Sequence, residues 1–273
     1  ERVEIFLFAM ACRLLGIRPI MMNDSKFDDY PRKLSRELGK SLFVAPYVGG
    51  LAGSIRTGDY MRFLGIPEGN IQFCYDAVSV KRLEDSSPGP AHADRDFLIV
   101  ARLVPKKNIE TAIRAYALFL HQTGATRKLV ICGSGPLLES LRALAVELGV
   151  ADKIIFKGFL QTQEIASLMR DSLALLLAST EEQFGQVVAE SQALNLPVIV
   201  SECCGARDEL VRNGVNGFVV EPKNIEGLAF FMNLIHADQN LWQRLRENAD
   251  QFKNVADVKR FAQSVNDLIS YDI

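Results

Sequence analysis

The sequence predicts an α/β fold built from two Rossmann-like domains, of which the first is incomplete. The first observation is that, from residue 96 onward, short apolar runs rich in β-branched residues alternate with longer runs of helical periodicity. This alternation is typical of a parallel sheet with crossover helices. The second observation is that residues 1–84 repeat the alternation over a shorter length. A chain of 273 residues, 48% of them hydrophobic, is long enough to bury one large core or two smaller ones.

The first 84 residues provide only half of a Rossmann sheet. The opening helix is apolar nearly all round, as a helix packed between neighbours is, and we expect those neighbours to lie upstream of Glu1. We therefore interpret residues 1–84 as the carboxy-terminal part of a longer domain. The elements expected here are helix 3–16, strand 19–22, helix 32–38, strand 42–45, helix 54–64 and strand 71–75.

Residues 96–254 are expected to form a complete second Rossmann-type domain. A linker over residues 85–95, polar and rich in Pro, Gly and Ser, precedes it. Helices separate its strands, and one of them opens near Asn108 with a single apolar face. Residues 255–273 contain a closing helix that follows the last strand. The strands expected in this domain are 97–101, 128–132, 153–157, 173–178, 197–201 and 217–220.

Composition excludes several classes of function. The chain has 31 Lys and Arg against 33 Asp and Glu, so a general nucleic-acid surface is not expected. Its longest apolar run, residues 5–12, is far shorter than the roughly 20 residues that span a bilayer. The five cysteines form no C-x-x-C pair and have no His neighbours at metal spacing, which indicates a reducing compartment and no structural zinc.

Two cations follow the first strand of the second domain. Arg102 and Lys107 are delivered to the carboxyl edge of the predicted sheet, just before a helix. Ligands of doubly wound sheets bind at that edge, and such a pair suits a diphosphate. Taken alone, these residues could equally be solvated loop charges.

A glycine-rich turn follows the second strand of this domain, at Gly133-Ser-Gly135-Pro136. The dinucleotide fingerprint G-x-G-x-x-G would need a small residue at position 138, where the sequence has Leu138. The better interpretation is a tight strand-to-helix turn beside a ligand.

The stretch richest in candidate functional residues carries two glutamates eight positions apart. Glu182 is expected in a loop after a strand and Glu190 in the next helix, among apolar residues. A carboxylate there is costly without hydrogen-bond partners, which a sugar or ribose diol would supply. Phe184 and Gly185 open the helix and leave backbone N–H groups free for an anion. The alternatives are that Glu190 faces solvent and that Glu182 is solvated or stabilised by the helix dipole.

Taken together, the motifs of the second domain resemble a known family. The sequence looks like the donor half of a family 4 retaining glycosyltransferase of the type B, or two-Rossmann, fold, and is similar to it over about 120 residues. The motifs are, in order, Arg102-x4-Lys107, Gly133-Ser-Gly135-Pro136, Phe156-Lys-Gly158, Glu182-x7-Glu190, Pro197-Val-Ile, Gly205 with Glu209-Leu-Val, and Asn213-Gly-Val-Asn-Gly217-Phe.

The resemblance implies a role for each matching residue. Arg102 and Lys107 would hold the donor diphosphate and stabilise the departing nucleotide, while Glu182 would bind the transferred sugar. These three are the expected catalytic residues, with neither a metal nor a cofactor. The remaining donor contacts would come from Glu190 at the ribose, the amides around Phe184 and Gly185, the turn at Gly133, and the backbone near Phe159 and Leu160 at the base.

The sequence also departs from the family pattern. A Gly usually follows the first glutamate, where this chain has Gln183, and a Gly-Gly pair is replaced by Cys204-Gly205. Complete members also carry an opening glycine-rich loop and a His in the first domain. Neither has a counterpart here, because the three histidines fall in the linker and on expected helices. We therefore expect the first domain to be amino-terminally truncated and this fragment alone to be inactive.

The function implied by the resemblance is transfer of a hexosyl unit from a nucleotide-diphosphate sugar to a glycan or lipid-linked acceptor. Its expected setting is polysaccharide biosynthesis, in the cytoplasm or peripherally at the inner face of the membrane through the first domain. The closing helix would pack back on the first domain. The alternatives are a sugar-nucleotide epimerase of the same architecture and a nucleotide-binding fragment without activity.

Overall fold

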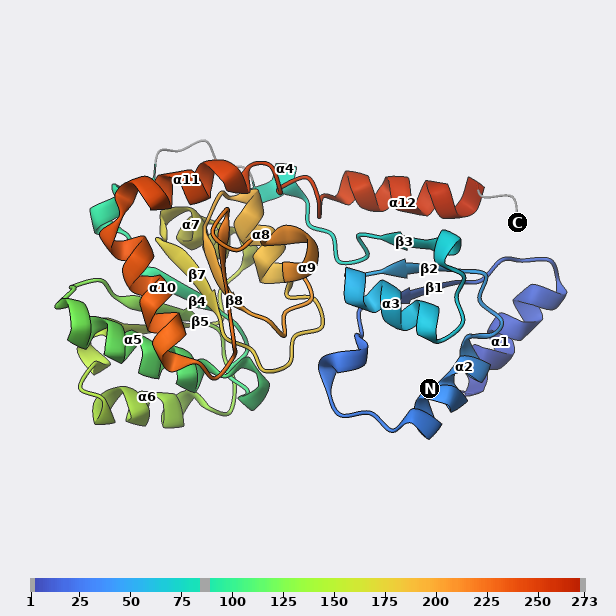
Figure 1. Cartoon of the computed structure of the whole chain (residues 1–273), viewed down its shortest axis with the longest axis horizontal. Helices are drawn as coiled ribbons and strands as arrows, with labels where there is room; N and C mark the ends of the chain where they lie inside the picture. Colours follow the sequence, from blue (N-terminus) through green and yellow to red (C-terminus); the bar gives the residue numbers. More distant parts are fainter. Residues whose placement is uncertain (1–2, 84–88, 271–273) are drawn as a thin grey trace.

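The computed structural model describes residues 3–83 and 89–270, and it places two parallel sheets side by side along the long axis of the molecule (Figure 1). We call residues 3–77 together with the last helix, α12 (Val258–Ser270), the first lobe. Residues 80–83 and 89–257 are the second lobe. Residues 84–88 of the expected linker, and Tyr271 at the end of the expected closing helix, lie outside the described residues.

The sheet of the second lobe has six parallel strands and confirms the α/β fold predicted for this region. Each strand is apolar on both faces, because helices cover both sides of the sheet. Phe97 and Ile99 face a core shared with α5 (Ile109–Thr123), α6 (Leu138–Glu147), α10 (Ile225–Ala237) and α11 (Gln239–Ala249). Leu98 faces the opposite core, which includes residues of α4 (Val80–Leu83), α7 (Thr162–Asp171), α8 (Gln186–Ala193) and α9 (Arg207–Leu210). The strands, in spatial order, are β6 (Ile154–Gly158), β5 (Leu129–Cys132), β4 (Phe97–Val100), β7 (Ala174–Leu177), β8 (Val198–Ser201) and β9 (Gly217–Val220).

The strand order of this sheet creates a gap at its carboxyl edge. From β4 the chain moves outward through β5 to β6, then returns to the other side of β4 to form β7. The connections that leave β4 and β7 therefore run in opposite directions. Such a switch point is where doubly wound sheets bind their ligands.

The first lobe contains a parallel sheet of three strands, β1 (Ile20–Asn23), β2 (Gly49–Ala52) and β3 (Ile71–Phe73). The predicted strand 42–45 is wrong, because those residues belong to the last turn of α2 (Leu34–Val44) and its C-cap. The true strand begins Gly49-Gly50, which has low β propensity and gave no strand signal. A Cβ on Gly50 would lie 2.7 Å from the sulfur of Met61 on α3 (Ile55–Phe63), and a Cβ on Gly49 would lie 3.2 Å from Leu268 on α12. Close packing on both faces explains the two glycines.

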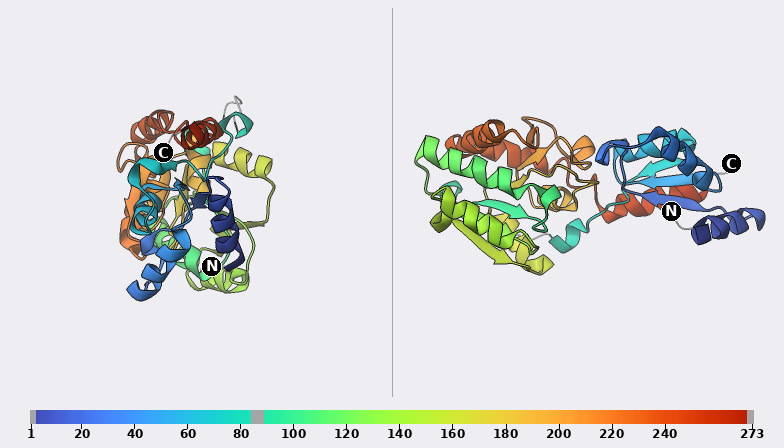
Figure 2. Two further views of the ribbon diagram at one scale, coloured as in Figure 1. Left: turned by 90° about the vertical axis from the view of Figure 1, so that its right-hand side faces the viewer. Right: turned by 90° about the horizontal axis from the view of Figure 1, so that it is seen from below.

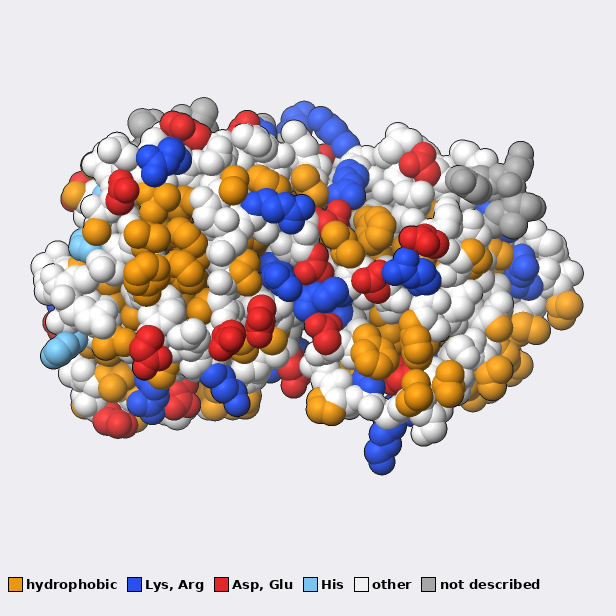
Figure 3. Space-filling model, viewed as in Figure 1, with side chains coloured by type: hydrophobic (Ala, Val, Ile, Leu, Met, Phe, Trp, Pro, Cys, Tyr) orange, Lys and Arg blue, Asp and Glu red, His pale blue; other side chains and the backbone are white. Residues whose placement is uncertain are grey.

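The opening helix, α1 (Val3–Leu14), lies at the surface in this structure. The sequence predicted a helix packed between neighbours, yet Ala9 alone among its described side chains is buried. Phe8 is 71% exposed. The helix thus presents apolar side chains on its outer faces, as Figure 3 shows along the lower right of the molecule.

The last helix lies against the sheet of the first lobe although it follows the second lobe in the sequence (Figures 1 and 2). It contacts β2 and β3, and the guanidinium of Arg18 donates to the carbonyls of Leu268 and Ile269 at 3.4 Å. Where the chain crosses back, the backbone N–H of Val258 donates to the carbonyl of Val78 at 3.0 Å. The chain therefore passes between the lobes twice, near Val78 and again near Val258, and the two segments are hydrogen-bonded to each other.

Candidate functional site

The loops after β4 and β7 meet at the switch point of the larger sheet. Lys107 ends a short 3-10 turn, η4 (Pro105–Lys107), and the next residue, Asn108, has a left-handed backbone with φ +50°. The side-chain amide of Asn108 donates to the carbonyl of Ala178 at 2.9 Å and to that of Pro222 at 2.6 Å. The backbone N–H of Thr180 donates to the carbonyl of Lys106 at 2.9 Å. These bonds fix the two loops against each other.

Lys107 and Glu182, predicted from the sequence as site residues, are in direct contact. The Lys107 ammonium forms an ion pair with Oε2 of Glu182, and both side chains are mostly buried, at 14% and 12% exposed. The hydroxyl of Ser179 donates to the same carboxylate oxygen at 3.1 Å. A cation and a carboxylate thus stand next to each other where the loops after the neighbouring strands β4 and β7 meet. Such a pair can separate to bind a phosphate and a sugar hydroxyl.

The glycine turn after β5 approaches the loop after β4 through its backbone. Gly133 has φ +137°, and a Cβ there would overlap the carbonyl oxygen of Ala101. A Cβ on Gly135 would overlap the carbonyl of Leu103. The amide of Gly133 donates to the carbonyl of Gly158 at 2.7 Å. The turn is therefore as tight as the sequence indicated, and only glycine allows the two loops to approach this closely.

Phe184 and Gly185 lie at the start of α8, behind Glu182. Phe184 is buried, and its carbonyl accepts from the thiol of Cys204 at 3.0 Å. Gly185 has φ +95°, and a Cβ there would lie 2.7 Å from the sulfur of Cys204 and 3.2 Å from Cγ of Glu182. Burial raises the pKa of the Cys204 thiol to about 12, so it stays protonated and donates. Cys204 therefore fills the space beside the glycine.

The remaining predicted residues lie around this centre without touching it. Arg102 is exposed and lines an open groove with Lys106 and Glu181. Phe159, just after β6, is 72% exposed, and Leu160 is half-buried. Both directly follow the carboxyl end of β6.

Glu190 lies on α8 as predicted and does not face open solvent. It lines a small cavity together with Leu83 of α4 and Met169 of α7. Burial raises the pKa of its carboxyl. The cavity is mostly apolar, and Thr162 is the other polar residue that lines it.

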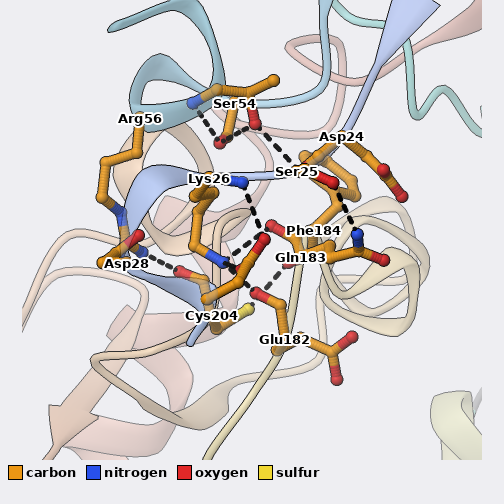
Figure 4. A network of polar contacts seen from close by, with 12 residues as sticks. Asp24, Ser25, Lys26, Asp28, Ser54, Arg56, Glu182, Gln183, Phe184 and Cys204 are labelled. Atoms are coloured by element: carbon orange, nitrogen blue, oxygen red, sulfur yellow. Dashed lines mark hydrogen bonds and ion pairs between the residues drawn. The ribbon is translucent and has the colours of Figure 1, made fainter. Parts of the chain in front are cut away.

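Side chains of the first lobe reach the loops that carry this site, which the sequence analysis missed (Figure 4). Lys26 follows β1 and is the N-cap of the 3-10 turn η1 (Phe27–Asp29), and its ammonium donates to the backbone carbonyl of Glu182 at 2.5 Å. Gln183 Nε2 donates to the hydroxyl of Ser25 at 3.0 Å. Arg56 of α3 donates to the carbonyl of Cys204 at 2.6 Å and pairs with Asp208 at 2.9 Å. The available signal was that Asp24-Ser-Lys26 directly follows a parallel strand, as Arg102 does.

Two carboxylates of the first lobe stand close together at the carboxyl edge of its sheet. Asp24 follows β1 and Asp76 follows β3, and a Cβ on Gly53 between them would overlap the Asp76 carboxylate. Burial, and then the charge of Asp24, raise the pKa of Asp76 to about 6. One carboxylate oxygen of Asp76 is buried and accepts no hydrogen bond from the protein.

Within residues 3–83 and 89–270, no three His, Cys, Asp or Glu side chains are grouped so that they could hold a metal ion. Over the same residues, every helix is too short or too polar to cross a membrane.

Comparison with solved structures places the architecture among type B glycosyltransferases. HepE of Anabaena in complex with UDP aligns with 97% of this chain and 75% of its own, with a TM-score of 0.81 and 20% identity. A lipopolysaccharide outer core galactosyltransferase, WaaB, aligns with 97% of this chain and 73% of its own, with a TM-score of 0.74 and 22% identity. At these identities the likeness shows the fold.

Sequence comparison gives the family. An uncharacterised glycosyltransferase of Methanocaldococcus jannaschii is 34% identical over 163 residues, which are 60% of this chain and 41% of that protein. A D-inositol 3-phosphate glycosyltransferase of Acidothermus cellulolyticus is 38% identical over 133 residues, 45% of this chain and 29% of that protein. The chain thus spans less than half the length of these curated relatives. The family model described as glycosyl transferases group 1 matches residues 80–252, most of the chain, and the chain therefore belongs to that family.

Proposed function

We propose that the protein transfers a hexosyl unit, with retention of configuration, from a nucleotide-diphosphate sugar to a glycan or lipid-linked acceptor. The observation that carries the proposal is the ion pair between Lys107 and Glu182 at the switch point of the larger sheet. Family membership and the UDP bound to a structural neighbour support it.

The arrangement suits a leaving diphosphate beside a sugar ring. With a donor bound, Lys107 would turn from Glu182 to the phosphates, and Arg102 in the adjoining groove would add a second cation. Positive charge fixed where the leaving group develops negative charge lowers the barrier by preorganised electrostatics. Glu182, released from the lysine, would accept hydrogen bonds from the sugar. Glu190, in its apolar cavity, would bind the ribose hydroxyls.

Donor binding is tested first, by thermal unfolding with UDP, GDP and ADP and with their glucose conjugates. A ligand that binds the native state raises the midpoint by mass action. We expect one nucleotide to raise it, and the rise to be lost in Lys107→Met and reduced in Glu190→Gln. Lys128→Met is the matched control, because Lys128 is an exposed cation just before β5, at the opposite edge of the sheet.

Transfer is then tested by incubating donor with acceptor lipid or glycan extracts and following the released nucleotide and the anomeric configuration of the product. Transfer that depends on Lys107 supports the proposal. Conversion of the donor without acceptor would instead indicate an epimerase. Binding by the wild type with neither reaction would indicate a nucleotide-binding role.

A further inference from the structure

We propose that Lys26 of the first lobe is a positioning residue for the loop that carries Glu182, so that the sugar-binding part of the site is complete only when the two lobes are together. The proposal rests on the function proposed above. Lys26 lies 156 residues from Glu182 in the sequence, yet its ammonium is buried against that loop.

The ammonium of Lys26 has all of its donors occupied. The side chain is 1% exposed and forms an ion pair with Asp29 of its own loop. Its other two acceptors are the backbone carbonyls of Glu182 at 2.5 Å and Gln183 at 3.3 Å. An ammonium group has three N–H donors, so this set saturates it.

These bonds place the backbone of the loop while its functional side chain points elsewhere. Figure 4 shows the Glu182 carboxylate directed away from Lys26, and it pairs with Lys107 on the other side. A hydrogen bond from Gln183 to Ser25 fixes the next side chain to the same segment of the first lobe. A Cβ at Gly205 would overlap the Gln183 carbonyl, so the loop also packs closely against its own lobe. Lys26 therefore acts through the loop and does not touch the sugar.

The charge on Lys26 is not required for packing alone. Burying an ammonium and a carboxylate together costs desolvation, and apolar or neutral replacements of such pairs are often as stable. Removing only one member would leave a buried charge without its main partner, so the test replaces both, as Lys26→Met with Asp29→Asn. A second form, Lys26→Arg, retains the charge and donors on a longer side chain.

The experiment measures the dissociation constants of a nucleoside diphosphate and of its glucose conjugate, using whichever of UDP, GDP and ADP the wild type binds. We expect the Lys26→Met/Asp29→Asn variant to bind the free nucleotide within twofold of wild type. Its preference for the glucose conjugate should fall about tenfold, which is the scale of one charge-assisted hydrogen bond. Lys26→Arg should restore part of that preference.

A double-mutant comparison separates positioning from general stability. Glu182→Gln should lower the same preference, and adding it to the Lys26 variant should cause little further loss, because both act through one loop. Equal weakening of both ligands, an unchanged preference, or additive losses would overturn the proposal. A wild type that binds none of the nucleotides would overturn the proposed function itself.

Discussion

The ammonium of Lys107 and the carboxylate of Glu182 neutralise each other between the loops that follow the neighbouring strands β4 and β7. Each side chain is mostly buried, so in the absence of a ligand each is the other's main charged partner. The pairing avoids leaving two mostly buried charges without a counter-charge.

This pairing predicts a measurable coupling in stability. Lys107→Met and Glu182→Gln should each lower the free energy of unfolding by about 2 kcal/mol, because each leaves a mostly buried partner without its counter-charge. The double variant should lose less than the sum, with a coupling of about 1–2 kcal/mol. Urea denaturation of the three variants measures this. Additive losses would show that the contact contributes nothing to the folded state.

The raised pKa of Asp76 predicts that the stability of the fold depends on pH. Its pKa of about 6 lies above the ordinary value of 3.8, so between these pH values the folded state holds more protons than the unfolded state. The free energy of unfolding therefore falls as pH rises through that window. Asp76→Asn should be more stable than wild type by about 1 kcal/mol at pH 7.5, with partial solvent exposure limiting the gain. At pH 4 the two should be alike. A gain that persists at pH 4 would contradict this origin.

The close packing around Gly133 predicts a large steric cost for adding a single methyl group at this position. Its positive φ and the overlap of a Cβ with the Ala101 carbonyl both oppose Gly133→Ala, which we expect to cost about 3 kcal/mol. Gly158→Ala is the matched control, since Gly158 has φ +70° but open space around it. It should cost about 1–2 kcal/mol from backbone strain alone. Equal midpoints in thermal unfolding would argue against the close approach of the two loops.

The contacts of Arg56 with Cys204 and Asp208 predict that this side chain of the first lobe keeps residues 204–210 of the second lobe ordered. Its guanidinium joins Asp28, Asp208 and the Cys204 carbonyl, an arrangement that a lysine cannot reproduce. In Arg56→Lys, amides of residues 204–210 should exchange with deuterium about tenfold faster, by the loss of one charge-assisted bond. Arg62→Lys is the control, because Arg62 lies on the same helix and pairs with Asp59 and Glu68 within the first lobe. Unchanged exchange in Arg56→Lys would exclude the link.

The sequence predicted the second lobe well for a physical reason. Its strands are continuous apolar runs and its helices have one apolar face, so local pattern and tertiary burial agree. Lys107 and Glu182 could be placed together because both follow parallel strands at one edge. The strand at Gly49 could not be predicted, since packing against Met61 and Leu268 determines it. The contact of Lys26 with Glu182 could not be predicted, because the two residues lie in different lobes and 156 positions apart in the sequence.

The helix α12 is synthesised after the whole second lobe, yet it packs against β2 and β3 of the first lobe, which are synthesised before that lobe. During synthesis, one face of β2 therefore stays uncovered until nearly the whole second lobe has emerged. Contacts of such long sequence separation form slowly and leave apolar surface exposed meanwhile. The first lobe should consequently complete its folding after the second, and nascent chains arrested before residue 258 should be the aggregation-prone species.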